Sequence, residues 1–354
     1  MLHTHAFMAA HTPVAVLGAS GFAGAELVRL LLGHPTLEPS FLGARGDAGM
    51  MVGEVFPHLG PIASQRFELV DALDASSVAA AFVALPAGES ATVVPGLVEA
   101  GARVVDLGAD FRLPADAYPG WYGFEHGAPE WLGKAVYGLT ERAREAVAGA
   151  AIVANPGCYP TPVGLGLAPL FETGLLDAGT TVVVDGKSGI SGAGKAPTAS
   201  SHFAALDGSV RAYKVGRHQH TPEMELAIRS AGASPAVTFI PHLVPTVRGV
   251  VTTCYARLAE GATEAALRDV LCDVYDGEPF VRVLPEGATP DPKRLTGSNG
   301  CELSAHVDEH AGTAIVIGAV DNLGKGAAGQ AIQNLNLMLG LPETAGLTSV
   351  GVYP

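Results

Sequence analysis

Short apolar runs alternate with helical stretches through the first half of the chain. Runs at 13–17, 78–85 and 104–107 each end at glycine or proline residues, which is typical of buried strands bounded by turns. A helical stretch follows the first of them at 25–32. Strands that alternate with helices as far as about Val153 predict a doubly wound α/β domain.

The second half has a different pattern of strands. Residues 180–185 are rich in β-branched side chains, and residues 313–320 form a long apolar run. A helix is expected after this run, with an apolar stripe made by Ala328, Ile332, Leu335 and Met338. We predict an α/β protein with a Rossmann-type dinucleotide-binding domain at 1–154, a second, α+β domain at 155–320, and a C-terminal helix within 321–354 that returns to the first domain.

The turn after the first strand is rich in glycine. Its sequence, Gly18-Ala19-Ser20-Gly21-Phe22-Ala23-Gly24, joins a strand to a helix, which is the setting of a dinucleotide fingerprint. Backbone N–H groups at the start of such a helix bind a pyrophosphate. The spacing is G-x-x-G-x-x-G instead of G-x-G-x-x-G, and glycines can also serve packing alone. The cofactor-binding residues predicted here are Gly18, Ser20, Gly21, Phe22 and Gly24.

Residues after the later strands bear on the identity of the cofactor. NAD enzymes usually place an acidic residue after the second strand to bind the ribose 2′-OH, whereas this chain has Ala44-Arg45. Arg45 can pair with a 2′-phosphate, which favours NADP; the alternative is a solvated loop arginine. The breaks at Leu85-Pro86 and at 108–112 also point toward the cofactor cleft, because ligands bind at the carboxyl ends of the strands.

The segment 155–161, Asn-Pro-Gly-Cys-Tyr-Pro-Thr, carries the strongest candidate nucleophile. It follows an apolar run at 150–154 and precedes another apolar stretch, so Cys158 is expected at a strand-to-helix turn. The helix dipole at such a turn can lower the pKa of the thiol and favour a thiolate. The alternative is that Cys158 is a small buried hydrophobic residue, as most free cysteines are. We predict that Cys158 is the catalytic nucleophile.

A glycine-serine loop at 186–195 follows the β-branched run. It imitates a P-loop, but Ala196 stands where a P-loop needs Ser or Thr for magnesium. A loop whose N–H groups bind a small anion fits better, and we assign Ser191 to the substrate and Ser188 and Gly189 to the cofactor. A basic cluster overlaps this loop, and its members are Lys187, Lys195, Arg211, Lys214 and Arg217. Such a cluster fits a phosphorylated or carboxylated substrate, although a solvated face is the alternative.

Two histidines precede a predicted helix start. His218 and His220 are two residues apart and therefore share one side of an extended backbone. Thr221 as N-cap, Pro222 at the first position and Glu223 in the first turn mark the start of the helix. One histidine can serve as the acid/base with Glu223 orienting it, or the histidines only pack and Glu223 complements the helix dipole. We predict no metal site, because no third ligand cluster accompanies the pair.

Composition argues against several classes of partner. The chain has 354 residues and a net charge of −14, which argues against a nucleic acid or an anionic membrane. No apolar run approaches the ~20 residues of a membrane span. The four cysteines form no C-x-x-C pair, so reduced thiols in the cytoplasm are expected. The N-terminal segment with His3, His5 and His11 is interpreted as a frayed leader and not as a signal peptide.

Seven motifs follow one another along nearly the whole chain, at 18–24, 109–112, 155–161, 188–195, 218–223, 248–249 and 321–326. Together they resemble those of the N-acetyl-γ-glutamyl-phosphate reductases of arginine biosynthesis, which are related to aspartate-semialdehyde dehydrogenases. The resemblance implies that the chain uses NADPH to reduce a small-molecule acyl phosphate to an aldehyde through a cysteine thioester. It also implies an oligomerisation role for the second domain, in a homodimer or homotetramer.

The resemblance assigns catalytic roles as well. It implies that Cys158 is the nucleophile and that His220, with Glu223, is the acid/base. His218 becomes a nearby polar partner that also faces the substrate, although the two histidines lie in the same motif.

Three residues are assigned to binding. The resemblance implies that Arg112 and Arg248 hold the anionic groups of the substrate. Asn322, at the turn after the last strand, can hydrogen-bond the cofactor carboxamide, or it can simply cap the helix that follows.

Three other interpretations remain open. A related reductase acts on carrier-bound aminoadipyl phosphate in lysine synthesis and typically has Gly-Cys-Asn-Ala-Thr at its nucleophile, whereas Tyr159-Pro160-Thr161 matches the arginine-pathway form. An aspartate-semialdehyde dehydrogenase is the second. The third is a non-catalytic NADP-sensing protein, which would keep the glycine turn but need neither Cys158 nor the basic cluster.

Overall fold

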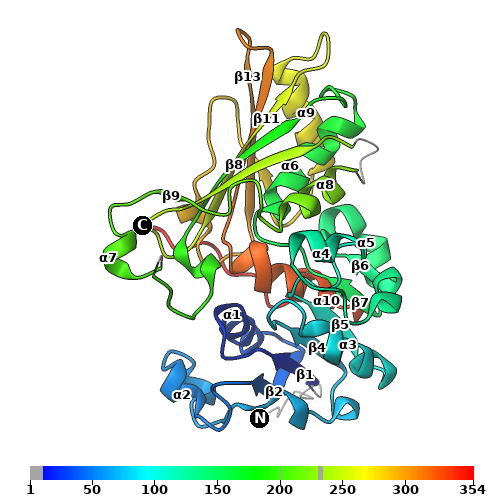
Figure 1. Cartoon of the computed structure of the whole chain (residues 1–354), viewed down its shortest axis with the longest axis vertical. Helices are drawn as coiled ribbons and strands as arrows, with labels where there is room; N and C mark the ends of the chain where they lie inside the picture. Colours follow the sequence, from blue (N-terminus) through cyan, green and yellow to red (C-terminus); the bar gives the residue numbers. More distant parts are fainter. Residues whose placement is uncertain (1–10, 200, 230–233) are drawn as a thin grey trace, which may run out of the picture.

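The structure is a computed structural model that describes residues 11–199, 201–229 and 234–354. Within these residues the strands form two sheets of seven strands each, one above the other in Figure 1. The first sheet is built from the N-terminal part of the chain, and the second from residues beyond 182. His3 and His5 of the expected leader lie outside the described residues, whereas His11 is described and exposed.

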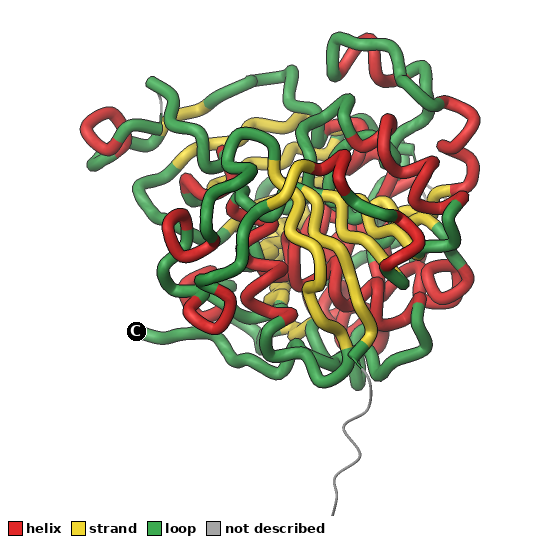
Figure 2. The backbone as a smooth tube through the Cα atoms, turned by 90° about the horizontal axis from the view of Figure 1, so that it is seen from below, coloured by secondary structure: helices red, strands yellow, loops and turns green. Residues whose placement is uncertain are grey.

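The first sheet is parallel, in the order β3-β2-β1-β4-β5-β7-β6. Its strands are β1 Thr12–Leu17, β2 Leu37–Ala44, β3 Glu68–Leu69, β4 Ala80–Val83, β5 Arg103–Asp106, β6 Ala135–Tyr137 and β7 Ile152–Ala154. The helices of this part are α1 Phe22–Leu31, α2 Val52–Val55, α3 Ser90–Glu99, α4 Ala117–Trp121 and α5 Thr140–Gly149, with short 3-10 helices at Gly60–Ile62, Val70–Ala72, Ala75–Ser77 and Pro129–Lys134. Seen from below, strands run through the middle of the molecule with helices on either side (Figure 2). The strand order turns back between β1 and β4, which opens a crevice at their carboxyl ends.

The second sheet is mixed, in the order β12-β13-β14-β11-β8-β10-β9. Its strands are β8 Val182–Ser188, β9 Arg211–Ala212, β10 Val237–Leu243, β11 Val250–Arg257, β12 Val281–Val283, β13 Cys301–Asp308 and β14 Thr313–Val320. The helices are α6 Pro160–Glu172, α7 Phe203–Leu206, α8 Thr221–Arg229 and α9 Glu264–Val274, with 3-10 helices at Ile190–Ala193 and Pro292–Leu295. The prediction of an α/β protein with a Rossmann-type first part and an α+β second part is confirmed.

The second sheet is covered on one face only. Helices α6, α8 and α9 pack against it through residues such as Leu165, Met224 and Leu267, all fully buried (Figure 1). Burial alternates along β8 and β11, as it does when one face of a sheet is packed and the other is open. On the open face, Val183 is 37% and Tyr255 36% exposed. This open face lacks a covering helix within the described residues, and it carries polar side chains, among them the ion pair of Asp185 and Lys187 on β8, beside the apolar ones.

The chain returns to the first sheet at its C-terminal end. A π-helical turn at Gly324–Ala328 leads into α10, Gly329–Met338. Residues of the predicted apolar stripe pack into the same core as Val14 and Leu27 of the first part; they are Ala328, Ile332, Leu335 and Met338. The prediction that the C-terminal helix packs against the first domain is confirmed.

The polar side of helix α10 is buried as well, although the apolar stripe in the sequence predicted burial of one side only. Gln330, Gln333, Asn334 and Asn336 are each fully buried. Asn334 donates to the carbonyl of Gly138 at 2.8 Å and to Asn155 Oδ1 at 3.1 Å, so it links α10 to the loop after β7. Burial of Gln333, Asn334 and Asn336 is tolerated because both polar atoms of each amide have partners. Gln330 donates to Thr161 Oγ1 at 3.0 Å, whereas its buried Oε1 has no partner within the described residues.

Several element boundaries differ from the expectation. The strand expected at 180–185 runs from Val182 to Ser188, because Gly186 and Lys187 continue its pairing with β10 and β11. The helix expected to begin after Thr221 begins at that residue. Thr221 is therefore not the N-cap; its Oγ1 is buried and has no hydrogen-bond partner within the described residues. Within those residues, no helix combines the length and apolar character needed to cross a membrane.

Candidate active site

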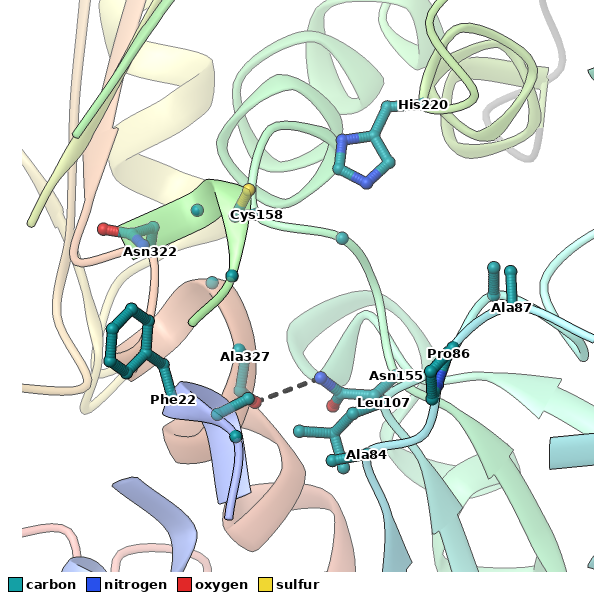
Figure 3. A pocket seen from close by; sticks show the side chains of 18 of the residues that line it. Phe22, Ala84, Pro86, Ala87, Leu107, Asn155, Cys158, His220, Asn322 and Ala327 are labelled. Atoms are coloured by element: carbon teal, nitrogen blue, oxygen red, sulfur yellow. Dashed lines mark hydrogen bonds between the residues drawn. The ribbon is translucent and has the colours of Figure 1, made fainter. Parts of the chain in front are cut away.

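A cavity of about 680 Å³ lies between the two sheets, at the carboxyl ends of the first. Its lining comes from the turn after β1, the ends of β4 and β5, the loop after β7 and the loop after β8, together with residues before α8 and after β14 (Figure 3). Ten of the predicted site residues line it: Gly21, Phe22, Gly24, Leu85, Pro86, Arg112, Cys158, Ser191, His220 and Asn322. The others lie behind the lining or outside it, at Gly18, Ser20, Arg45, Ser188, Gly189, His218, Glu223 and Arg248.

The glycine turn forms one end of this cavity. Gly18 has a φ of +86°, and a Cβ there would overlap the carbonyl of Ala84 beyond β4. A Cβ on Gly24 would in turn overlap the carbonyl of Gly18. Only glycine allows this close approach of β1, α1 and β4. Helix α1 has Gly21 as its N-cap and no side-chain cap, so its first N–H groups are open to a diphosphate.

Two ion pairs border the glycine-lined end. Arg45 lies just beyond β2, as predicted, and its Nε is 2.6 Å from Glu89 Oε2. Lys195, from the loop after β8, reaches the first domain and donates to Asp47 Oδ2 at 2.9 Å. The bonds from Lys195 and from Ser20 lower the pKa of Asp47. Two cations therefore stand at this end, one from each domain.

Cys158 lies between β7 and α6, at the strand-to-helix turn that its sequence predicts. It is half-buried and faces the cavity, beside the π-helical turn: a Cβ on Gly326 would lie 2.8 Å from the Cβ of Cys158. Burial, together with the negative charge of Glu223, raises the pKa of the Cys158 thiol to about 11. The expectation of a lowered thiol pKa is therefore wrong for the free protein, because burial outweighs the helix dipole.

His220 and Cys158 face each other. Figure 3 shows the imidazole of His220 turned toward the thiol across the mouth of the cavity. The ring packs on Gly157, where any Cβ would overlap Nε2. Burial, with the charges of Arg112 and Lys214, lowers the pKa of His220 well below its usual value. His220 is thus neutral near pH 7, and its Nδ1 has no hydrogen-bond partner within the described residues, so it can accept a proton.

His218 lies behind His220 and not in the lining. Its Nδ1 accepts a hydrogen bond from the backbone N–H of His220 at 3.1 Å, and the two rings meet edge to face at 4.7 Å. Burial lowers the pKa of His218 to about 2, so it stays a neutral acceptor. These contacts support His218 as a positioning residue for His220.

Glu223 connects the parts of the site. Its carboxylate is fully buried and accepts hydrogen bonds from the Gly157 N–H at 2.6 Å and the Tyr137 hydroxyl at 2.9 Å. It also pairs with Arg112, at 3.2 Å from Nη1. The closest approach of His220 Nε2 to this carboxylate is 4.0 Å. Glu223 therefore fixes the loop before Cys158 and the guanidinium of Arg112 more directly than it orients the imidazole.

The two predicted substrate arginines differ in position. Arg112 lines the cavity; its Nη2 donates to the Leu107 carbonyl at 2.8 Å, and its buried Nε has no partner within the described residues. Arg248 lies outside the lining and pairs with Glu26 at 2.9 Å and with Asp321 at 2.8 Å. These two carboxylates occupy the guanidinium of Arg248, which links α1 to the turn after β14.

The loop after β8 is held by Asn322. The Asn322 side chain accepts from the Gly249 N–H at 2.7 Å and donates to Ser191 Oγ at 2.9 Å. Ser188 donates to the Gly189 carbonyl at 2.9 Å and is buried behind the loop. A Cβ on Gly189 would lie 2.8 Å from the backbone of Val247. Ser188 and Gly189 therefore shape the loop from behind, while Ser191 and Asn322 face the cavity.

Sequence reasoning missed several lining residues. Trp121 and Tyr122 come from the end of α4 and belong to no recognisable pattern. Gln219 lies between the two histidines of the motif at 218–223, and sequence reasoning assigned it no role. Asn155 also lines the cavity, where its amide donates to the Ala327 carbonyl at 3.1 Å (Figure 3). The available signals were the motifs that contain Asn155 and Gln219 and the basic cluster, which contains Lys195 and Lys214, both in the lining.

The alkylation rate of Cys158 tests whether the pKa of its thiol is raised. In the cofactor-free protein, alkylation of Cys158 by iodoacetamide is expected to keep rising with pH beyond about pH 9, because the thiolate reacts and its pKa lies near 11. Mass spectrometry of the Cys158 peptide after timed labelling measures the rate, with the peptide of exposed Cys272 followed in parallel as a reference. A plateau close to neutral pH would show a preformed thiolate and contradict the raised pKa.

Two family models cover most of the chain. The NAD binding domain of semialdehyde dehydrogenases matches residues 13–150, and the dimerisation domain of semialdehyde dehydrogenases matches residues 158–322. Among solved structures, aspartate semialdehyde dehydrogenase II of Vibrio cholerae, complexed with ASA, has a TM-score of 0.70 at 18% identity and covers 94% of this chain and 99% of its own. An aspartate semialdehyde dehydrogenase with NADP from Candida albicans has a TM-score of 0.66 at 16% identity, covering 93% of this chain and 99% of its own. These structures share the fold.

Much more similar sequences are known. An N-acetyl-gamma-glutamyl-phosphate reductase of Desulforudis audaxviator is 47% identical over 96% of this chain and 99% of its own length. One of Pelotomaculum thermopropionicum is 45% identical over the same shares of the two chains. The sequence identity to these two relatives covers almost the entire chain, and so includes both domains and the site between them. The chain therefore belongs to the N-acetyl-γ-glutamyl-phosphate reductase family.

Proposed function

We propose that the protein reduces N-acetyl-γ-glutamyl phosphate to N-acetyl-glutamate 5-semialdehyde with NADPH, releasing phosphate, as a step of arginine biosynthesis. The observation that carries this proposal is the placement of Cys158 and a neutral His220, facing each other, in a cavity that continues into the glycine turn after β1. A thiol nucleophile, a base and a dinucleotide-binding turn in one cavity are what a phosphorylating aldehyde-forming oxidoreductase needs.

The residues present fit a dinucleotide. Side chains at Gly18 and Gly24 would overlap neighbouring backbone, so the turn needs glycine at both positions. The first N–H groups of α1 have no side-chain cap, and the cavity extends from them to Cys158. Gly21, Phe22 and Gly24 would hold the diphosphate, Leu85 and Pro86 would flank the cofactor along β4, and Arg45 would hold a 2′-phosphate. Ser191 and Asn322 lie on the side of the cavity nearest Cys158.

The first chemical step starts from neutral groups. As the sulfur of Cys158 attacks the acyl carbon, His220 accepts the thiol proton, so a thiolate forms only when substrate is in place. The new S–C bond replaces the C–O bond to phosphate, whose electron pair leaves with the phosphate. The acyl group is then held as a thioester on Cys158. Arg112, fixed by Glu223 and Leu107, is placed to hold an anionic group of the substrate during this step.

Aldehyde release uses the same two side chains. Bound NADPH supplies the hydride that reduces the carbonyl held on Cys158. His220 donates its proton to the oxyanion, accepts it again as the C–S bond breaks, and returns it to the sulfur. The covalent link keeps the carbonyl fixed throughout, so the reduction is effectively unimolecular.

The protein is further proposed to work as a homodimer or homotetramer in the cytoplasm. The open face of the second sheet, with exposed Val183 and Tyr255, would be covered by a second copy of the chain, and the matching family model is that of a dimerisation domain. All four cysteines are free, which suits a reducing compartment.

Steady-state assays with three acyl phosphates test the proposed reaction. NADPH oxidation should be fastest with N-acetyl-γ-glutamyl phosphate, compared with aspartyl phosphate and a carrier-bound aminoadipyl phosphate. The reverse reaction, with phosphate, NADP and the three aldehydes, should show the same order. A preference for aspartyl phosphate would make the protein an aspartate-semialdehyde dehydrogenase, and no turnover with any of them would favour an NADP-sensing protein.

Replacing Arg45 by Asp is expected to shift cofactor preference from NADPH toward NADH. A charge-assisted arginine–phosphate contact contributes roughly 1.5–3 kcal/mol, so the ratio of kcat/KM values should change by about tenfold or more. Steady-state kinetics with both cofactors measure the ratio. Arg103→Asp is the matched control. Arg103 lies at the start of β5, at the end of the strand away from the cavity, and donates to the Ala150 carbonyl. An unchanged ratio in Arg45→Asp would mean that another residue reads the 2′-phosphate.

A further inference from the structure

The structure separates the basic cluster into residues with different surroundings. Lys187 pairs with Asp185 on β8, and Arg211 and Arg217 are exposed outside the cavity lining. Only Lys195 and Lys214 of this cluster line the cavity. Of the five cations in the basic cluster, two lysines therefore lie at the site.

The cations of the lining differ in how far their charge is neutralised. Arg112 pairs with Glu223, and Lys195 pairs with Asp47. Lys214 donates to the neutral Oε1 of Gln219 at 2.9 Å, and no carboxylate in the described part of the chain forms an ion pair with it. Lys214 thus brings to the cavity a positive charge that no carboxylate among residues 11–199, 201–229 and 234–354 offsets in an ion pair.

The backbone at Lys214 is unusual. Among the described residues it is the single non-glycine with a positive φ, at +43°. This left-handed conformation costs a residue with a side chain roughly 1 kcal/mol or more, and such strain is concentrated at functional sites. The Lys214 carbonyl accepts from the Arg217 N–H at 2.9 Å, so a turn holds the strained residue in place. The turn presents the ammonium to the cavity beside Gln219 and His220.

Lys214 is close enough to act on the catalytic histidine. Its charge, after burial and the charge of Arg112, contributes to the lowered pKa of His220. An anion bound by Lys214 would therefore lie beside the imidazole that faces Cys158. In the acyl phosphate, the phosphoryl oxygen is bonded directly to the carbon that Cys158 attacks, whereas the α-carboxylate lies at the far end of the carbon chain. The phosphoryl group is thus the anion that His220 and Lys214 can share.

We propose that Lys214 binds the phosphoryl group of the substrate and stabilises the departing phosphate, an inference that rests on the proposed function. As the S–C bond forms, the C–O bond breaks and its electron pair moves onto the phosphate, while the thiol proton moves to His220. Negative charge grows on the phosphate during this step, and a cation without a protein counter-ion stabilises it most effectively. Gln219 positions the ammonium in the free protein.

The reverse reaction separates the two anions of the substrate, because phosphate and aldehyde then bind as different reactants. In Lys214→Asn, the KM for inorganic phosphate should rise by about tenfold or more, while the KM for the aldehyde and the Kd for NADP stay close to wild type. Asparagine tolerates the left-handed backbone and removes the charge. Arg217→Asn is the matched control and should behave like wild type; Lys214→Arg should recover much of the affinity for phosphate.

A rise in the KM for the aldehyde alone would place Lys214 at the carboxylate and overturn the proposal, as would unchanged values for both reactants. A second measurement needs no turnover. Inorganic phosphate should slow the alkylation of Cys158 in wild type and in Arg217→Asn, but far less in Lys214→Asn. Equal protection in all three would overturn the role of Lys214. Inactivity of the wild type toward acyl phosphates would instead overturn the proposed function.

Discussion

Replacing Cys158 by serine is expected to lower turnover by roughly 10⁴-fold or more and to leave the Kd for NADPH essentially unchanged. The serine hydroxyl is a poorer nucleophile than a thiol, and its alkoxide is a poor leaving group when the aldehyde must be released. The glycine turn that would hold the cofactor diphosphate lies between β1 and α1, whereas Cys158 lies between β7 and α6, so the substitution should not alter the turn. Stopped-flow reduction and fluorescence titration with NADPH measure the two quantities separately.

The control for this variant is Cys272→Ser, because Cys272 is exposed on α9 and should not affect turnover. Mass spectrometry adds a direct test of the covalent step. Wild type incubated with the acyl phosphate and no cofactor should gain the mass of the acyl group on the Cys158 peptide, and Cys158→Ser should not. A serine variant that retains much of its activity would remove Cys158 from the mechanism.

Replacing His220 by asparagine is expected to lower kcat by ~10²–10⁴-fold, the range for a positioned acid/base, with a much smaller effect on substrate binding. His218→Asn should cost less, because His218 acts through His220, by accepting from its backbone N–H and by packing on its ring. Single-turnover kinetics with and without a deuterated cofactor show whether the loss falls on the acylation step.

The pH profile distinguishes His220 from a merely structural residue. Since the pKa of His220 is well below its usual value, the neutral base persists to lower pH than an ordinary histidine would allow. The acid limb of wild-type kcat/KM should therefore lie well below pH 6.5 and be absent from His220→Asn. If His218→Asn is the crippling change instead, the two histidines must exchange roles; if neither matters, proton transfer uses another group.

Local sequence was sufficient for the features that depend on adjacent residues. The glycine turn, the strand-to-helix position of Cys158 and the start of α8 near Thr221 all follow from the order of residue types over a few positions. The assignment of Cys158 and His220 to one catalytic site came from a resemblance, because the two residues are 62 positions apart in the sequence. The pattern of residue types does not show by itself that two such distant segments line the same cavity.

Features that depend on distant contacts were not predictable in the same way. Arg248 was expected to hold substrate, but Glu26 and Asp321 approach it from separate parts of the chain and pair with it. The raised pKa of Cys158 depends on how deeply the folded chain buries the thiol, which no local motif records. The strained backbone of Lys214 is likewise visible only in three dimensions.

The return of α10 to the first sheet has a consequence for how the protein is made. Domains generally fold in turn as they leave the ribosome, the N-terminal one first. Here Ile332 and Leu335 complete the core around Val14 and Leu27, and Asn334 fastens the loop that carries Cys158. The first domain to be synthesised is therefore the last to be finished. Its core around Val14 and Leu27 stays incomplete until residues 329–338 have been synthesised, and a nascent chain must be kept from aggregating through that interval.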